Sequence, residues 1–486
     1  MALDYDGGMG NIVDYVRTDF RTFAEHPFSA VDSLVLSELS YIRLPLVVPV
    51  FGAARSIDTM PVSGLLRAED FPAMFAADSQ QVNSTRLDLL VAVAESPRFR
   101  GMRVGEYVQR DDADREQQFA AMTFDLVDCT GIRESFGAGG LLYVAFRGTD
   151  GTLLGWKEDF NMAFRCPVPS QESAARYLSS ILDRSAGVPG GEAPAVMVGG
   201  HSKGGNMAVY AAVRMAARDL DAMQWLADES GESQLPMIEA TSTDGRLSGR
   251  KRSSGQVSHI DDDGQDGRND RVHRGDRGNN GSGNNIGSGN NGRNDRNDRG
   301  DEHSRYAARI RRVFSHDGPG FPKRLESAAF EAMAARVDKT VPQSSVVGML
   351  MDDGLPHRVI EADAVGIMQH LGMSWQVEDG EFVMAPGLSA TATFAGSTVN
   401  AWMLGIDPID RRKVIDELYA IFSAPGYRSF GELAEHWTTA LPAVIEAARH
   451  TDRETRRLVA GVLAALPATA WRNLPQVPQL VIDSLR

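Results

Sequence analysis

The stretch AVMVGGHSKGGNMAVYAA, residues 195–212, decides the fold. Its first five residues form a short apolar run that is typical of a buried strand, and the Ala- and Met-rich residues 206–217 favour a helix. Between the two lies a G-x-S-x-G pattern centred on Ser202. A serine on a sharp strand-to-helix turn requires small residues two positions before and after it, because the backbones approach closely there. The stretch therefore predicts a nucleophile elbow that exposes the Ser202 hydroxyl at the carboxyl end of a strand.

Two other interpretations of this pattern are weaker. A glycine-rich turn with an incidental serine does not require a strand before it and a helix after it. A phosphate-binding P-loop requires Gly-Lys followed by Ser or Thr, whereas here Lys203 precedes Gly204. Ser202 is therefore the candidate nucleophile, and the next backbone N–H lies at a helix N-terminus, where developing negative charge is favoured.

The segments on either side continue an alternation of strands and helices. Residues 141–147 (LLYVAFR) and 311–315 (RRVFS) predict strands, and residues 170–185 carry apolar side chains at helical spacing. Strands that alternate with helices imply parallel crossovers. The expected fold class is α/β, with a doubly wound and mostly parallel sheet.

One shift in composition divides the chain. Residues 241–304 consist largely of Gly, Asn, Asp, Arg and Ser, with 11 basic and 11 acidic residues and only five aliphatic ones. Such a segment cannot bury enough apolar surface to offset its ordering entropy, so we expect a disordered, neutral tether rather than a basic nucleic-acid arm. The predicted α/β domain is therefore in two parts, 1–240 and 305–385, separated by the insertion 241–304.

Residues 386–486 are expected to form a helical C-terminal domain. Asp407-Pro408 is a helix start signal. Apolar residues at helical spacing follow it, at Val414, Ile415, Leu418, Ile421 and Phe422, at Leu433, Trp437 and Leu441, and at Leu458, Val459, Val462, Leu463 and Leu466. Core packing explains these faces better than a membrane-surface role does.

Composition limits the classes of partner and the location. The 50 Lys and Arg residues against 65 Asp and Glu give a formal net charge of −15, which argues against a nucleic-acid partner. Only Cys129 and Cys166 are present, so a reducing compartment is favoured and a four-cysteine zinc site is excluded. The start lacks the basic and apolar regions of a secretory signal, and no apolar run reaches the ~20 residues of a transmembrane helix. These features predict a cytoplasmic protein.

Six blocks of the sequence resemble a known family. They are DSLVLSELSYIRLP (32–45), FRGTDGTLLGWKEDFNMAF (146–164), GGHSKGGNMAVYAA (199–212), HDGPGF (316–321), VPQSSVVGMLM (341–351) and QHLGMSWQV (369–377). In this order they are similar to an uncharacterised bacterial α/β-hydrolase-like family, a domain of unknown function. The second and third blocks also resemble the class 3 (fungal-type) lipases. The resemblance covers about residues 10–385 and implies an α/β-hydrolase-like fold and an ester hydrolase. The acyl transfer of such an enzyme needs no cofactor and no metal, and the sequence has no metal-ligand motif such as H-E-x-x-H.

The resemblance also implies roles for individual residues. In the lipases the residue after Arg-Gly supplies an oxyanion-hole donor, which corresponds here to Thr149, and the backbone N–H of Lys203 is the second donor. The chain order Ser, acid, His of this fold leaves His357, His370, His436 and His450 as bases. His370 is preferred because it lies shortly before Trp375, as the catalytic histidine of the lipases lies shortly before a Trp.

The acid remains open between two aspartates. Asp317 follows a predicted strand on a turn, and Asp338 lies shortly before Val341-Pro342, which resembles the lipase order with a different spacing. Asp317 is preferred. An ordinary turn or helix-cap aspartate is the alternative for each.

These residues predict a serine esterase or lipase that acts on a small-molecule or lipid ester through an acyl-enzyme. The side chain of Lys203 is expected beside the cleft, where its ammonium would favour a polar or anionic ester. The rival hypothesis is a non-catalytic protein on a hydrolase-like scaffold, which binds a protein partner through its C-terminal helices.

Overall fold

The computed structural model describes residues 10–76, 79–186, 192–217, 307–322, 328–405, 407–429, 432–433 and 436–451. All of them belong to one compact unit. A second unit, Gln234–Arg296, lies outside the described residues, as do the whole predicted insertion 241–304 and the predicted helix around residues 458–466.

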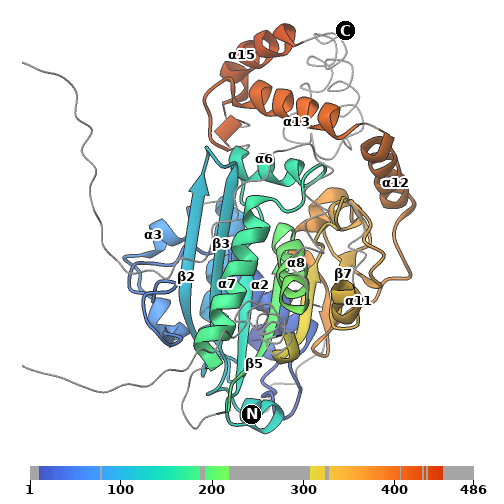
Figure 1. The fold of residues 1–486 in the computed structure, drawn as a ribbon. Helices are drawn as coiled ribbons and strands as arrows, with labels where there is room; N and C mark the ends of the chain where they lie inside the picture. Colours follow the sequence, from blue (N-terminus) through green and yellow to red (C-terminus); the bar gives the residue numbers. More distant parts are fainter. Residues whose placement is uncertain are drawn as a thin grey trace, which may run out of the picture. The chain divides into compact units, whose positions relative to one another are not determined.

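The centre of the described chain is an eight-stranded mixed sheet (Figure 1). Its strands are β1 (Thr59–Pro61), β2 (Arg103–Asp112), β3 (Gln117–Asp125), β4 (Leu141–Phe146), β5 (Ala195–His201), β6 (Ile310–His316), β7 (Val337–Pro342) and β8 (His357–Ile360). Strands β1 to β4 pair antiparallel, and strands β4 to β8 pair parallel. The three strands predicted from the sequence are β4, β5 and β6 of the parallel half, so the α/β class is confirmed.

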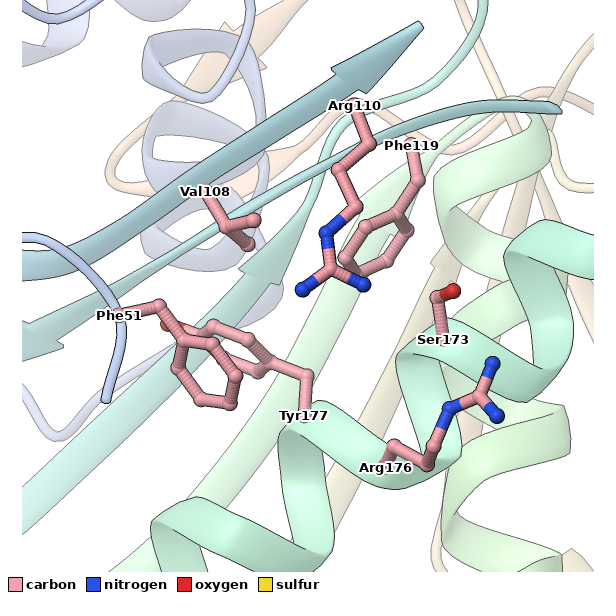
Figure 2. Close-up of a pocket in the computed structure, with 7 residues that line it drawn as sticks. All are labelled: Phe51, Val108, Arg110, Phe119, Ser173, Arg176 and Tyr177. Carbon is pink, nitrogen blue, oxygen red and sulfur yellow. The ribbon is translucent and has the colours of Figure 1, made fainter. Parts of the chain in front are cut away.

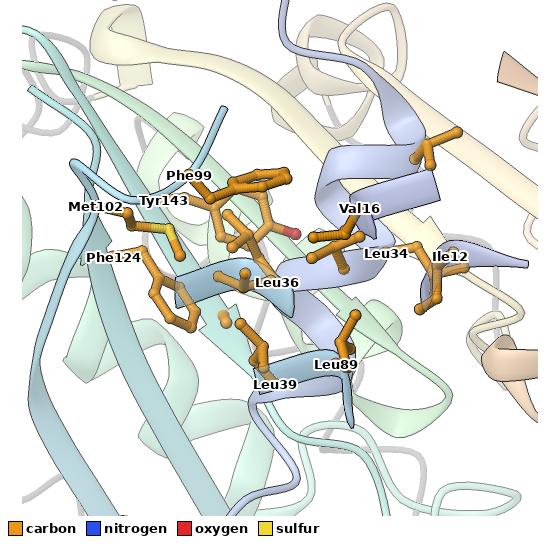
Figure 3. Close-up of a cluster of buried hydrophobic side chains, with 14 of the residues drawn as sticks. Ile12, Val16, Leu34, Leu36, Leu39, Leu89, Phe99, Met102, Phe124 and Tyr143 are labelled. Atoms are coloured by element: carbon orange, nitrogen blue, oxygen red, sulfur yellow. The ribbon is translucent and has the colours of Figure 1, made fainter. Parts of the chain in front are cut away.

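Alternate residues of the strands face two separate apolar cores. On one face, Leu142 and Val144 of β4 pack with α7 (Pro169–Ala186), α8 (Lys203–Ala216) and α11 (Ala328–Ala334). On the other face, Tyr143 of β4 packs with α1 (Ile12–Thr18), α2 (Ala30–Leu39) and α4 (Gln80–Glu95) (Figure 3). This alternation follows from the two-residue period of a strand, and it explains why all six residues of β4 are buried.

The winding of the sheet differs from the doubly wound one that the sequence predicts. A doubly wound sheet reverses its strand order, whereas here the order runs from β1 to β8 without reversal. Helices α7, α8 and α11 therefore lie on one face, since right-handed crossovers that advance in one direction all fall on the same side. The second face is covered by helices that precede the parallel strands in the chain. Helices cover both faces of the sheet, but the predicted doubly wound topology is wrong.

The N-terminal helices begin at side-chain caps. The Ser29 hydroxyl accepts from the N–H of Val31 and Asp32, and the Asp32 carboxylate accepts from the Ser29 N–H, which is a capping box. Every residue of α2 is buried, because the helix lies between the sheet and the neighbouring helix α4. The shorter elements are α3 (Phe71–Met74), α5 (Ile132–Phe136), α6 (Leu153–Asn161), η1 (Val62–Leu65), η3 (Val347–Met349), η4 (Gly366–His370), η5 (Gly372–Ser374), β9 (Val377–Glu378) and β10 (Glu381–Phe382).

Three further helices follow the sheet, α12 (Ala390–Gly405), α13 (Pro408–Ser423) and α15 (Trp437–His450). The Asp407 carboxylate accepts from the Ile409 N–H, so the predicted helix start at Asp407-Pro408 is confirmed. Among the described residues, no helix has the length and apolar character required to cross a membrane.

Candidate active site

Ser202 occupies a strained turn between β5 and α8. Its backbone has φ 58° and ψ −132°, which is unfavourable for a residue with a side chain. Two hydrogen bonds hold it there: its N–H donates to the carbonyl of His316 at 2.9 Å, and its carbonyl accepts from the Gly205 N–H at 2.9 Å. The residue is 7% exposed. These two hydrogen bonds therefore hold Ser202 in a backbone conformation that residues with a side chain rarely adopt.

The glycines of the motif allow the backbones to come together. A Cβ at Gly200 would overlap the carbonyl carbon of Gly204, and a Cβ at Gly204 would overlap the carbonyl oxygen of Phe146. A Cβ at Gly148 would lie 3.1 Å from the Ser202 Cβ. The loop that follows β4 thus lies directly against the turn, as expected if the FRGT block supplies a donor near Ser202.

His370 and Asp317 are joined by a hydrogen bond. His370 Nδ1 lies 2.6 Å from Asp317 Oδ2, and His370 is 24% exposed on its side chain whereas Asp317 is fully buried. A carboxylate can only accept, so Nδ1 donates and the Nε2 atom of a neutral His370 ring is left as an acceptor. The structure therefore brings together the preferred base and the preferred acid.

The Asp317 carboxylate is held by three groups. Besides His370, its Oδ1 accepts from the Ser345 hydroxyl and, at 3.1 Å, from the Gly348 N–H. Asp317 directly follows β6 and has a positive φ of 50°. Asp317 and Ser202 thus occupy the same position, immediately after neighbouring parallel strands.

Asp338, the other aspartate considered as the acid, lies elsewhere. It is the second residue of β7 and pairs in register with Phe314 of β6, three residues before Asp317. Its Oδ1 accepts from Arg358 Nη2 at 2.7 Å. The structure assigns Asp338 to an ion pair within the sheet and does not bring it to His370.

His201 contacts His370 through a network that the sequence does not reveal. His201 Nε2 lies 2.6 Å from the carbonyl oxygen of His370, and its Nδ1 lies 2.9 Å from the Tyr41 hydroxyl. Since a carbonyl only accepts, Nε2 donates and Nδ1 accepts from Tyr41. Burial lowers the pKa of His201 well below its ordinary value, so the ring stays neutral. The hydrogen bond from His201 to the His370 carbonyl places the proposed base next to the residue that precedes Ser202.

Trp375 and Gln369 hold the segment that carries His370 in place. The Trp375 indole N–H donates to the Gln369 carbonyl at 2.8 Å, and the Gln369 Oε1 accepts from the Ser344 N–H at 2.7 Å. Trp375 is fully buried. The Trp that guided the prediction of His370 therefore anchors the histidine loop to the core.

The Thr149 side chain binds the carboxylate of Asp159, a side chain that is 25% exposed. Its hydroxyl donates to Asp159 Oδ2 at 2.5 Å. Burial raises the pKa of Asp159 to about 6, against the opposing effects of the Lys203 ammonium and the Thr149 hydroxyl. Asp159 lies on α6, so this helix fixes the orientation of the loop after β4.

The expected position of the Lys203 side chain is wrong. Lys203 is 1% exposed, and its ammonium donates to Glu158 Oε2 at 3.0 Å and to the Gln118 carbonyl at 3.1 Å. Burial lowers the pKa of Lys203, but Glu158 and Asp159 raise it more, so the net shift is upward. The ammonium therefore lies in the interior, paired with Glu158, and not beside a cleft. Lys203 is the first residue of α8, so its backbone N–H has no acceptor within the helix.

A cavity of about 130 Å³ lies away from these residues (Figure 2). It is formed by β2, β3, α7 and a loop, and is lined by Phe51, Val108, Arg110, Phe119, Ser173, Arg176 and Tyr177. None of the candidate catalytic residues lines it. In the described part of the chain, no group of three or more His, Cys, Asp or Glu residues is arranged to hold a metal ion.

Comparison with known proteins gives one result. No curated protein and no solved structure matches the chain. A family model described as Mbeg1-like matches residues 93–420, a range that includes Thr149, Ser202, Asp317 and His370. This match spans more than half of the sequence, and the chain therefore belongs to the Mbeg1-like family.

Proposed function

We propose that the protein is a serine hydrolase of the esterase or lipase type, which cleaves a carboxylic ester through an acyl-enzyme. The observation that carries this proposal is the hydrogen bond from His370 to Asp317 beside a strained serine turn. Strained backbone persists only where the surroundings enforce it, and it is concentrated at functional sites. The resemblance to class 3 lipases supports the same chemistry.

In the proposed mechanism Ser202 is the nucleophile and His370 the general base. The His370 Nε2 atom takes the hydroxyl proton while Oγ attacks the ester carbonyl, and Asp317 stabilises the imidazolium that forms. The imidazolium then protonates the leaving alcohol. Water, activated by the same ring, attacks the acyl-enzyme and releases the acid. No cofactor takes part in these steps.

The tetrahedral intermediate requires donors for its oxyanion. The backbone N–H groups of Thr149 and Lys203 are the proposed pair, because Gly148 brings the first loop against Ser202 and Lys203 opens α8. Loss of one such donor typically lowers kcat about 100- to 1,000-fold. Asp159 supports the pair by holding the Thr149 side chain.

Exposed apolar side chains favour an ester with an apolar acyl chain. Trp156 and Phe160 project from α6, the helix that carries Asp159, and their ring centroids are 5.9 Å apart. Val365 and Met368 are exposed beside and within η4, the element that ends at His370. Apolar surface thus flanks the segments that carry both the oxyanion loop and the base. We therefore propose a lipid ester as the substrate class.

The location that we propose is the cytoplasm. The two cysteines, which are buried and form no disulfide, are consistent with this reducing compartment.

A fluorophosphonate probe tests the proposal, because it reacts covalently with activated serines. We expect it to label the wild type and the control variant Ser63→Ala, which removes an exposed hydroxyl on η1, but not Ser202→Ala. We expect His370→Ala to reduce hydrolysis of p-nitrophenyl esters by orders of magnitude with little change in Tm.

The rival hypothesis predicts the opposite result. A correctly folded wild type that takes up no probe and hydrolyses no ester of any acyl length would favour a non-catalytic scaffold. Labelling that survives in Ser202→Ala would move the nucleophile elsewhere.

A further inference from the structure

The position of the Asp317 carboxylate depends on the loop at residues 343–351. The Ser345 hydroxyl and the Gly348 N–H both donate to Asp317 Oδ1. Only Oδ2 is then left for His370. A shift of this loop would move the carboxylate and, through it, the imidazole.

One residue of α12 holds that loop. Asn400 donates its Nδ2–H to the Met349 carbonyl at 2.7 Å and accepts from the Met351 N–H at 2.8 Å. A single amide therefore binds two backbone groups, one and three residues after Gly348. Such a pair of bonds restrains both the position and the tilt of the loop.

Helix α13 contacts α6, and the two helices lie side by side (Figure 1). Arg411 Nη1 donates to the Ala163 carbonyl at 2.7 Å, just after α6 ends. Asp416 forms an ion pair with Lys157, whose side chain is 3% exposed. Because α6 carries Asp159, which binds Thr149, these contacts reach the proposed oxyanion loop.

A small apolar cluster joins the segment after α6 to the loop at residues 343–351. Ile415 of α13 packs with Ala163 and Phe164, which follow α6, and Leu350 and Met351 of the acid loop pack against the same cluster. The C-terminal helices therefore contact both segments that support the site, rather than forming a separate layer.

We propose that α12 and α13 position the two halves of the site, and that Asn400 is the residue that sets the Asp317 carboxylate. The inference rests on the proposed function. Asn400 touches no reacting atom, so it is a positioning residue that acts through Gly348 and Asp317. It gives the C-terminal helices a role in turnover.

The variant Asn400→Leu tests this in the full chain, since it removes both bonds at similar volume. Misplacing a catalytic group by about 1 Å can lower the rate about 100-fold. We expect kcat to fall at least about 10-fold and KM to stay within about 2-fold. We also expect the NMR signal of the His370 Nδ1 proton, which is bonded to Asp317, to shift or broaden. The matched control Thr393→Ala, at an exposed position of the same helix, should change neither readout.

A folded Asn400→Leu protein with wild-type kcat and an unchanged His370 signal would overturn the inference. If that variant does not fold, Asn400→Asp replaces it, because the carboxylate still accepts from Met351 but cannot donate to Met349. Wild-type readouts there would overturn the inference equally. The proton signal needs no substrate, so an inactive wild type whose signal depends on Asn400 would refute the proposed function and leave the positioning role standing.

Discussion

Replacing Lys203 by Met would measure the ion pair that lies under the serine turn. Lys203 and Glu158 are both buried, and their charged atoms are 3.0 Å apart. Glu158 also accepts from the N–H of Gln118 at 2.9 Å and from the N–H of Ser170 at 2.8 Å, together with the Ser170 hydroxyl. Met preserves the length of the side chain and removes the charge, so Glu158 is left without its cation.

Breaking a buried pair by removing one partner destabilises a protein by about 3–5 kcal/mol, since it leaves an uncompensated buried charge. The three other donors to Glu158 place the expected loss near the lower end of that range, at about 3 kcal/mol. The double variant Lys203→Met with Glu158→Gln removes both charges, and we expect it to recover part of the loss.

Urea unfolding followed by tryptophan fluorescence gives the free energies, with Lys413→Met as the control for an exposed lysine. Fluorophosphonate labelling of the folded Lys203→Met protein should persist, because the backbone N–H of the proposed oxyanion hole is retained. A stability change below about 0.5 kcal/mol would refute the reasoning, since that is the range of an exposed side chain. That result would mean that the Lys203 ammonium lies at the cleft and not in the interior.

Two further predictions concern strain and pH. Ser202→Gly should be more stable to urea than Ser202→Ala by about 1 kcal/mol or more, because Gly accepts φ 58° without a Cβ clash; equal stabilities would mean that the turn is unstrained. Asp159 has a pKa of about 6 in the folded chain against an ordinary 3.8, so the folded state binds the extra proton between these values and its stability should fall as pH rises from about 4 to about 6. Asp159→Asn lacks this dependence, and the difference between wild type and variant should change by up to about 3 kcal/mol across that window; parallel urea curves at both pH values would contradict the assignment.

The sequence predicts the parallel half of the sheet because its signals are local. An apolar run, a glycine turn and an Ala-rich segment are adjacent in residues 195–217, and each fixes its own backbone. The N-terminal half lacks such signals: α2 is buried on all sides yet contains Asp32, Ser33, Ser37 and Glu38, so its composition shows no apolar face. The strand order depends on which helices cover the second face, and these helices are distant in sequence.

The residues of the candidate site also fall into two groups: those that the sequence predicts and those that depend on contacts with distant segments. Ser202 is predicted by local pattern, Asp317 by its place on a turn after a strand, and His370 by chain order and resemblance. The direction of the Lys203 side chain instead depends on Glu158, 45 residues earlier. The ammonium points to the interior because a carboxylate from a distant segment lies there to accept its hydrogen bond. The spacing of residues within the G-x-S-x-G motif carries no information about that carboxylate. Tyr41 and Asn400 escape sequence reasoning for the same reason, since each acts through one contact with a distant backbone or ring.

The backbone at Ser202 and Asp317 helps to distinguish a hydrolase from an inert scaffold. Ser202 and Asp317 both have positive φ, both directly follow parallel strands, and the Ser202 N–H binds the residue before Asp317. At Ser202, whose φ and ψ are unfavourable for a residue with a side chain, such strain costs roughly 1–3 kcal/mol, and a glycine there would relieve it. Aspartate adopts positive φ more readily, so the cost at Asp317 is smaller. A scaffold that only binds partners gains nothing from retaining side chains there, whereas a triad requires both side chains in these positions. Four other described non-glycine residues, Glu106, Glu116, Met351 and Asp379, also have positive φ. Catalysis is therefore supported by the combination of the strained Ser202 turn with the hydrogen bond from His370 to Asp317, and not by positive φ alone.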